Sequence, residues 1–223
     1  MTGLRRTWWV AVALAGMVAG AAVSRAQQAP VFQIDFTNPQ LMPSHWQIKL
    51  NPDGTGHFDA AGMGTEGADS IKIQAGEVHR AIQLSPGFTL QVFATARRKK
   101  LFAFPCDSRM KVAFQGTKRL SYSGPEGSGE CEFNYSKDKD IQALGDSLLA
   151  VEATLLFGAR LEKLLVHDRL GLDREMENLV SAAKEGQVVE VGAIRETLSK
   201  IATDEQVMDR ARKKARLLLS QAN

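Results

Sequence analysis

The chain has few cysteines and little excess of charge of either sign. Two cysteines in 223 residues are too few for a disulfide-rich miniprotein, so the fold must rest on a packed core. Twenty-eight basic residues against 25 acidic ones give a net charge of +3, which is weak support for a polyanionic partner. A content of 44% hydrophobic and 24% charged residues excludes a disordered, collagen-like or multiply membrane-spanning chain.

Long apolar runs are scarce, and the clearest one lies at the N-terminus. It follows the basic pair Arg5-Arg6 and reaches Ser24 without a charge. A basic start followed by an apolar run indicates a secretory signal peptide, and small residues at Ser24 and Ala26 suit cleavage after Ala26. We therefore expect residues 1–26 to be removed and the mature chain to be periplasmic or extracellular. The alternative is an uncleaved N-terminal anchor.

Removal of the signal changes the charge of the chain. Residues 1–26 carry three arginines and no acid, so the mature chain would hold 25 basic and 25 acidic residues. For this neutral chain we expect no nucleic acid partner and no membrane span. Another envelope protein or an anionic glycan remains as an expected partner.

Proline and phenylalanine are scarce in the C-terminal part. All seven prolines lie at or before Pro125, and nine of the ten phenylalanines lie at or before Phe133. In this first part, short alternating runs between turn residues predict an antiparallel sandwich or barrel-like domain at 27–137. The predicted strands are 45–50, 56–60, 70–74, 78–84, 88–96, 110–115, 120–123 and 130–135.

Beyond Asp138 the apolar residues recur at three- and four-residue steps, which predicts helices. Breaks at 167–172, at Gly186 and near Thr203 divide the pattern into four helices, enough for a small bundle. We therefore predict an α-helical domain at 138–223. Together the two parts give an α+β fold class.

Cys106 and Cys131 both lie in the β-rich part of a chain that we expect to be exported. This combination predicts a disulfide bond, with two buried free thiols as the alternative. The spacing is not Cys-x-x-Cys, so a redox-active role is not indicated.

Gly145-Asp146-Ser147-Leu148 matches the motif of GDSL-type hydrolases, in which the serine is the nucleophile. In that family a later Asp-x-x-His supplies the base, and none follows here; the one downstream histidine is His167. Because a serine without a base is not activated, we expect Ser147 on a helix surface and predict no catalytic residue.

Three further patterns point to cofactor, metal or sugar sites. Gly62–Gly67 matches Gly-x-Gly-x-x-Gly but precedes a strand-like run, so we expect a loop and no cofactor. His45, His57 and His79 lie in the β-rich part without a known zinc spacing, so no metal ligand is predicted. Trp46 alternates with apolar neighbours, which favours a core position over a sugar-stacking platform.

The densest charge run is Arg97-Arg98-Lys99-Lys100. Such a run can bind an anionic glycan, a phosphate or a membrane surface, and we take it as the candidate anion-binding site. The alternative is a solvated hairpin tip between two apolar strands, where like charges discourage aggregation.

We expect an exported, non-catalytic binding or structural protein of the cell envelope, without a cofactor. A ligand-binding β-domain for an anionic glycan, using Arg97–Lys100, is the alternative. An enzyme is less expected, either a hydrolase through Ser147 or a metalloenzyme through His45, His57 and His79.

Overall fold

The computed structural model describes residues 29–61 and 77–222. The predicted signal peptide, the strand expected at 70–74 and the loop Gly62–Gly67 lie outside these residues. The elements are, in chain order, β1 (Val31–Thr37), β2 (His45–Leu50), β3 (Thr55–Ala61), β4 (Val78–Gln83), α1 (Pro86–Arg98), η1 (Lys100–Phe102), β5 (Thr117–Gly124), β6 (Gly127–Phe133), α2 (Lys139–His167), α3 (Gly171–Lys184), η2 (Val191–Ile194), α4 (Arg195–Thr203) and α5 (Asp209–Gln221).

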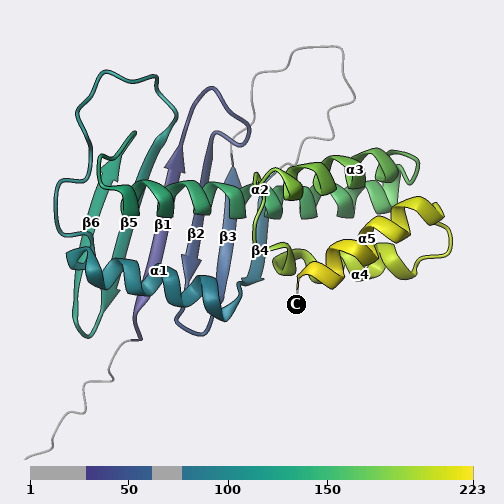
Figure 1. The fold of residues 1–223 in the computed structure, drawn as a ribbon, viewed down its shortest axis with the longest axis horizontal. Coiled ribbons are helices and arrows are strands. Elements are labelled where there is room, and N and C mark those ends of the chain that lie inside the picture. The colour runs from purple at the N-terminus through teal and green to yellow at the C-terminus, as the bar shows by residue number, and fades with distance from the viewer. Residues whose placement is uncertain (1–28, 62–76, 223) are drawn as a thin grey trace, which may run out of the picture.

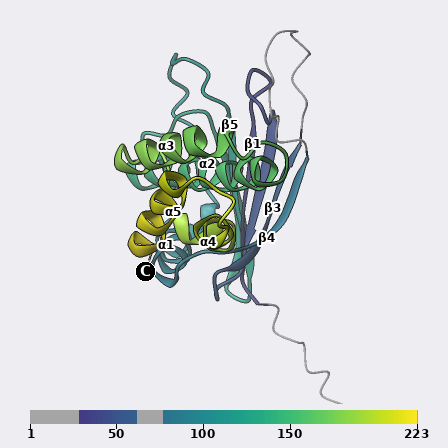
Figure 2. The ribbon, with the colours of Figure 1, turned by 90° about the vertical axis from the view of Figure 1, so that its right-hand side faces the viewer.

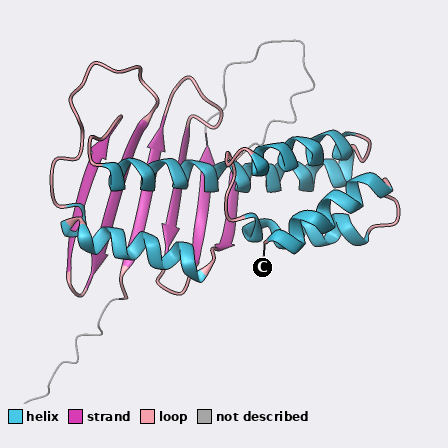
Figure 3. Ribbon diagram, in the orientation of Figure 1, coloured by secondary structure: helices cyan, strands magenta, loops and turns pink. Residues whose placement is uncertain are grey.

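The strands form one six-stranded antiparallel sheet in the order β4-β3-β2-β1-β5-β6 (Figures 1 and 3). Helix α1 leads from the β4 edge back across the sheet toward β5, and α2 crosses the sheet in the opposite direction. Both helices lie on the same face, as the view along the sheet shows (Figure 2). The predicted α+β class is therefore confirmed, with a sheet that is open rather than closed.

The alternation of buried and half-buried residues along the strands shows which face of the sheet the helices cover. Strand β1 buries Phe32, Ile34 and Phe36 completely or nearly so, while the residues between them are only half-buried. Successive side chains of a strand point to opposite faces, so every second residue joins the core under the helices. Strand β1 lies inside the sheet, between β2 and β5.

The segment 88–96 is helical, which corrects the predicted strand. Pro86 occupies the start of α1, and the Oγ of Ser85 accepts a hydrogen bond from the amide of Phe88 at 3.2 Å, which caps the helix. The buried residues of α1 follow helical steps and are Thr89, Val92, Phe93, Thr95 and Ala96. This spacing places them on the sheet-facing side.

The strand predicted at 110–115 is also wrong, because this segment is an exposed loop. The side chain of Asn134 forms hydrogen bonds with backbone groups of this segment. The Nδ2 of Asn134 donates to the carbonyl of Ala113 at 3.1 Å, and its Oδ1 accepts from the amide of Gln115 at 2.8 Å. The amide side chain thus makes the backbone hydrogen bonds that a neighbouring strand would otherwise make. Met110 and Phe114, both 51% exposed, point away from the core.

Helix α2 connects the sheet to the other helices. Its 29 residues extend about 44 Å at 1.5 Å per residue. Near its start Gly145 lies against the sheet, where an added Cβ would be 3.1 Å from Lys118 and Phe133. Further along, an added Cβ at Gly158 would be 2.4 Å from Ile194. Helices α3 and α4 pack against α2, and α5 packs against α3 and α4 (Figure 1).

By length and composition α2 could span a membrane, and it is the one helix in the described residues that meets this criterion. Half of its most apolar window is buried inside the protein. Leu144, Leu148, Val151 and Leu155 are at most 3% exposed. A core helix has the same composition.

Two polar contacts join the sheet to the helical part. The carboxylate of Glu190 accepts hydrogen bonds from the amide of Ser85 at 2.5 Å and from its Oγ at 2.7 Å. Arg80 of β4 pairs with Glu162 of α2 at 3.0 Å. One cluster of buried apolar residues extends from the sheet through α2 to α5. The predicted boundary near residue 137 stays a prediction.

The other face of the sheet is polar. Side chains of neighbouring strands bond to one another there: Gln47 donates to Asp35 at 2.6 Å, and Asp59 contacts the Nδ1 of His79 at 2.6 Å. The carboxylate of Asp59 raises the pKa of His79. The polar side chains on this face are therefore suited to contact with water.

Asp138 supports the junction between sheet and helix. Its Oδ1 accepts from the amides of Asp140 at 3.0 Å and Ile141 at 3.3 Å, and its Oδ2 binds Lys99 at 2.7 Å. We expect Asp138→Ala to lower the free energy of unfolding by about 1 to 2 kcal/mol, because the cap of α2 is lost.

Urea denaturation measures this loss. Asp140→Ala is the matched control, since Asp140 also contacts Lys99, at 3.0 Å, but does not cap the helix. We expect the control to change stability by less than about 0.5 kcal/mol. Equal losses in the two variants would contradict a capping role.

Candidate functional site

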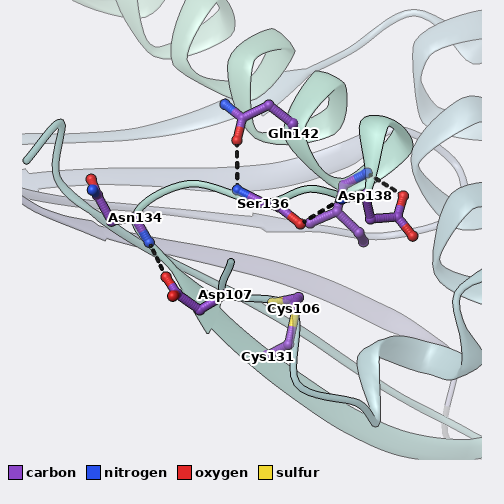
Figure 4. The surroundings of a disulfide bond; sticks show 8 residues. Cys106, Asp107, Cys131, Asn134, Ser136, Asp138 and Gln142 are labelled. Carbon is purple, nitrogen blue, oxygen red and sulfur yellow. Dashed lines mark hydrogen bonds between the residues drawn. A yellow bond between two sulfur atoms is a disulfide. The ribbon is translucent and has the colours of Figure 1, made fainter. Parts of the chain in front are cut away.

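Cys106 and Cys131 lie at disulfide distance, as predicted. Their sulfur atoms are 2.18 Å apart and their Cα atoms 5.8 Å apart. The pair joins the segment after η1 to strand β6, and the amide of Asn134 donates to Asp107 beside it at 3.0 Å (Figure 4). These contacts hold the exposed loop at its base.

The basic run Arg97–Lys100 lies in the last turn of α1 and the start of η1, rather than at a hairpin tip. Arg97 binds both carboxylate oxygens of Glu126 through Nε, at 3.0 and 3.1 Å. This contact raises the pKa of Arg97 and lowers that of Glu126. Cations at the end of a helix also face its negative dipole.

Lys99 is also paired. It contacts Asp138 at 2.7 Å and Asp140 at 3.0 Å, and these two carboxylates raise its pKa. Arg98 donates to the Oγ1 of Thr95 at 3.0 Å. Anion binding by Arg97–Lys100 stays a prediction, and an anion there would compete with acidic partners for Arg97 and Lys99.

The hydrolase-like motif lies within α2. The hydroxyl of Ser147 donates to the carbonyl of Ala143 at 2.8 Å, as a helical serine commonly does. His167 is at the far end of the same helix, about 30 Å along its axis. The two residues are therefore too far apart to act together.

The three histidines of the β-rich part lie on the polar face of the sheet. His45 contacts Thr37 at 3.3 Å, and His79 contacts Asp59. Between residues 29–61 and 77–222, no group of three or more His, Cys, Asp or Glu residues is arranged to hold a metal ion. The structure thus does not gather His45, His57 and His79 into one site.

Lys118 is a buried cation, and its burial was not predicted from the sequence. It is fully buried, and its Nζ donates to the carbonyls of Asn134 at 3.0 Å and Gly116 at 3.4 Å. Burial lowers its pKa. Because both carbonyls belong to segments that frame the exposed loop, we infer a structural role.

A cavity of about 220 Å³ lies between the β1–β2 loop and the middle of α2. The strands and their loop contribute Phe36, Leu41, Met42, Pro43 and Trp46 to its lining. Helix α2 contributes Leu149, Glu152, Ala153, Leu156, Phe157 and Arg160. The lining is therefore apolar except for one acid and one base. We call it the Glu152 cavity.

The wall on the sheet side is aromatic and fixed. Trp46 and Phe36 are each 1% exposed, and their rings stack with centroids 5.2 Å apart. Trp46 thus lies in the core, as predicted, and also lines the cavity. At the mouth the side chains of Leu41 and Met42 are 50% and 44% exposed. The peptide bond between Met42 and Pro43 is cis.

Glu152 is the unusual group of this cavity. Burial raises its pKa from 4.5 to about 7, and the positive charge of Arg160 opposes the rise. Its carboxyl makes no hydrogen bond with the parts of the chain that the structure describes. Carboxyl groups with raised pKa values in clefts are common at functional sites.

Arg160 does not neutralise Glu152 directly. Its Nε donates to Glu175 of α3 at 2.7 Å, and its guanidinium lies 4.3 Å from the ring centroid of Phe157. Glu175 and Phe157 therefore hold this cation. Ionised Glu152 would add one uncompensated negative charge to the cavity.

The sequence carries one signal for Glu152. From Ser147 to Ala159 it is the only charged residue in an otherwise uncharged helical segment. A lone acid in such a segment must be exposed, paired or shifted in pKa. The remaining lining could not be predicted, because the loop 38–44 contacts α2 only after folding.

Polar and apolar residues both line two larger hollows. One of about 570 Å³ lies beside the start of α1, where Ser85 and Glu190 bond to each other. Another of about 460 Å³ lies over β1, β5 and β6, and its Glu130 pairs with Arg119. The Glu152 cavity differs from both in its unbonded carboxyl.

No protein-family model matches the sequence, and a search of the curated proteins finds no significant match. The Glu152 cavity is therefore the feature on which a functional proposal rests.

Proposed function

We propose that the protein is an exported, non-catalytic binding protein of the cell envelope, and that it binds an apolar group in the Glu152 cavity. The carrying observation is an apolar cavity whose mouth exposes Leu41 and Met42 to solvent. Exposed apolar side chains at the edge of a cavity are typical of binding sites.

The size of the cavity limits what it can take. Its volume of about 220 Å³ is below the roughly 300 to 1,000 Å³ of pockets for drug-sized ligands. A small molecule or one apolar side chain of a partner protein fits this volume. Both agree with a binding protein of the envelope.

Two observations support the non-catalytic and exported parts of the proposal. Ser147, the serine of the hydrolase-like motif, bonds to a backbone carbonyl and lies about 30 Å from His167. The cysteine pair at disulfide distance is compatible with an oxidising compartment. The N-terminal sequence adds the expected signal peptide.

A neutral fluorescent probe tests the cavity. We expect N-phenyl-1-naphthylamine to bind with enhanced fluorescence, and Ala153→Phe, which fills the cavity, to weaken its binding at least tenfold. The matched control is Ala143→Phe, because Ala143 is exposed on the same helix outside the lining. We expect wild-type affinity for this control.

A second variant guards against a folding defect in Ala153→Phe. Met42→Ser makes the mouth polar without adding volume, and it should weaken the probe severalfold. Circular dichroism checks the fold of each variant. Wild-type affinity in both Ala153→Phe and Met42→Ser, or no binding by the wild type, would refute the proposal.

A further inference from the structure

We propose that the Glu152 cavity selects an organic ammonium ion with an apolar body, for which the carboxylate of Glu152 is the counter-ion. This inference rests on the proposed function and names the chemical class of its ligand. It follows from one carboxyl group set among apolar and aromatic walls.

The charges around the cavity favour a cation. Arg160, the one base in the lining, is held by Glu175 at 2.7 Å, so this pair adds no net charge. Strands β1 and β2 and their loop contribute no titratable side chain to the lining. Ionised Glu152 therefore leaves a net charge of about minus one for a ligand to neutralise.

The walls suit the apolar part of such a ligand. Phe36, Trp46 and Phe157 all line the cavity and give it apolar walls. A ligand with an apolar body would contact these walls while its ammonium group pairs with Glu152.

Other ligand classes lose part of these contacts. A carboxylate ligand would face Glu152 and would have to displace Glu175 from Arg160. A neutral alcohol would fill the apolar volume but form no ion pair. We therefore expect the order of affinity to be ammonium, then alcohol, then carboxylate.

Binding of a cation should also release a proton. Near pH 7 about half of Glu152 is protonated, since burial raises its pKa to about 7. An ammonium ion stabilises the ionised form, so about half a proton leaves per ligand bound. From pH 5.5 to 8.5 the affinity for the cation should rise about thirtyfold.

Isothermal titration calorimetry of the full exported protein tests the class of ligand. The probes are 2-phenylethylammonium, 2-phenylethanol and 3-phenylpropanoate, which share an apolar body and differ in charge. At pH 8.5 we expect the ammonium to bind at least tenfold more tightly than the alcohol. Titrations at pH 7 in phosphate and in HEPES give the number of protons released.

Glu152→Gln identifies the counter-ion. This variant should bind the ammonium and the alcohol equally and release no proton. Glu205→Gln, on an exposed loop after α4, is the control for the loss of one negative charge and should keep the preference. Retained binding of N-phenyl-1-naphthylamine verifies that the Glu152→Gln cavity is intact.

The outcomes separate this inference from the proposed function. Equal affinity of the wild type for ammonium and alcohol, or tighter binding of the carboxylate, would overturn the inference of a cationic ligand. The proposal that the cavity binds an apolar group would still stand. A preference that survives in Glu152→Gln would overturn the role of Glu152. If none of the three probes binds, the inference of a cationic ligand is overturned. Binding of N-phenyl-1-naphthylamine then decides whether the proposed function holds.

Discussion

Loss of the disulfide is expected to lower the free energy of unfolding by about 3.5 kcal/mol. Cys106 and Cys131 are 25 residues apart in sequence, and the closed loop contains all of β5. Linking its ends restricts the unfolded chain far more than the folded one. A stabilisation of this size arises from the lost conformational entropy of the loop.

Urea denaturation of a Cys106→Ala, Cys131→Ala double variant measures the effect. Both cysteines are buried, so the smaller side chains add a modest packing loss. Reduced wild-type protein, with its two thiols counted after denaturation, should give nearly the same loss without any change in sequence. The variant itself should not respond to reductant. A difference below about 1 kcal/mol would contradict this prediction.

The second large effect depends on pH and concerns Glu152. Burial raises its folded-state pKa from 4.5 to about 7. The protonated form is thus favoured in the folded protein, and this contribution is complete below about pH 4.5 and is lost as the pH rises through 7. The free energy of unfolding should fall over this range by up to about 3 kcal/mol on account of this group.

Glu152→Gln removes this dependence. Relative to wild type, the variant should become more stable by about 2 to 3 kcal/mol between pH 4.5 and pH 8, because an amide bears no charge to desolvate. Urea denaturation of both proteins at several pH values gives the difference. Glu205→Gln corrects for the general loss of one charge. A difference between Glu152→Gln and wild type that stays constant with pH would refute the raised pKa.

The fold class could be predicted from the sequence, and the one misassigned helix shows where the signal was ambiguous. In the segment 88–96 the apolar residues at even positions suggested a strand. The buried apolar positions are Val92, Phe93 and Ala96, at helical steps. The helix start at Ser85-Pro86 was the better signal, because a serine cap followed by proline is specific for helices.

The other misassignments have different physical causes. Strand β1 alternates apolar and polar residues as clearly as its neighbours, but it was not assigned. At 110–115 alternation was present without a strand, because Asn134 takes the backbone groups that a neighbouring strand would have bonded. A single side chain can thus replace a strand, and periodicity does not reveal it.

The candidate site was less predictable than the fold. The disulfide pair followed from composition and an expected compartment. The Glu152 cavity is lined both by Met42 and by the middle of α2, which are more than a hundred residues apart in sequence. Long-range contacts of this kind leave no local periodicity.

The polar face of the sheet has a consequence for solubility. Gln47 and Asp35, and His79 and Asp59, already satisfy one another there. For two molecules to aggregate through these faces, both would have to shed water from charged groups that gain no new partners. Association through this side of the sheet is thus disfavoured. Among the described residues, the exposed apolar side chains lie elsewhere, in loops and on helices α1, α2 and α5.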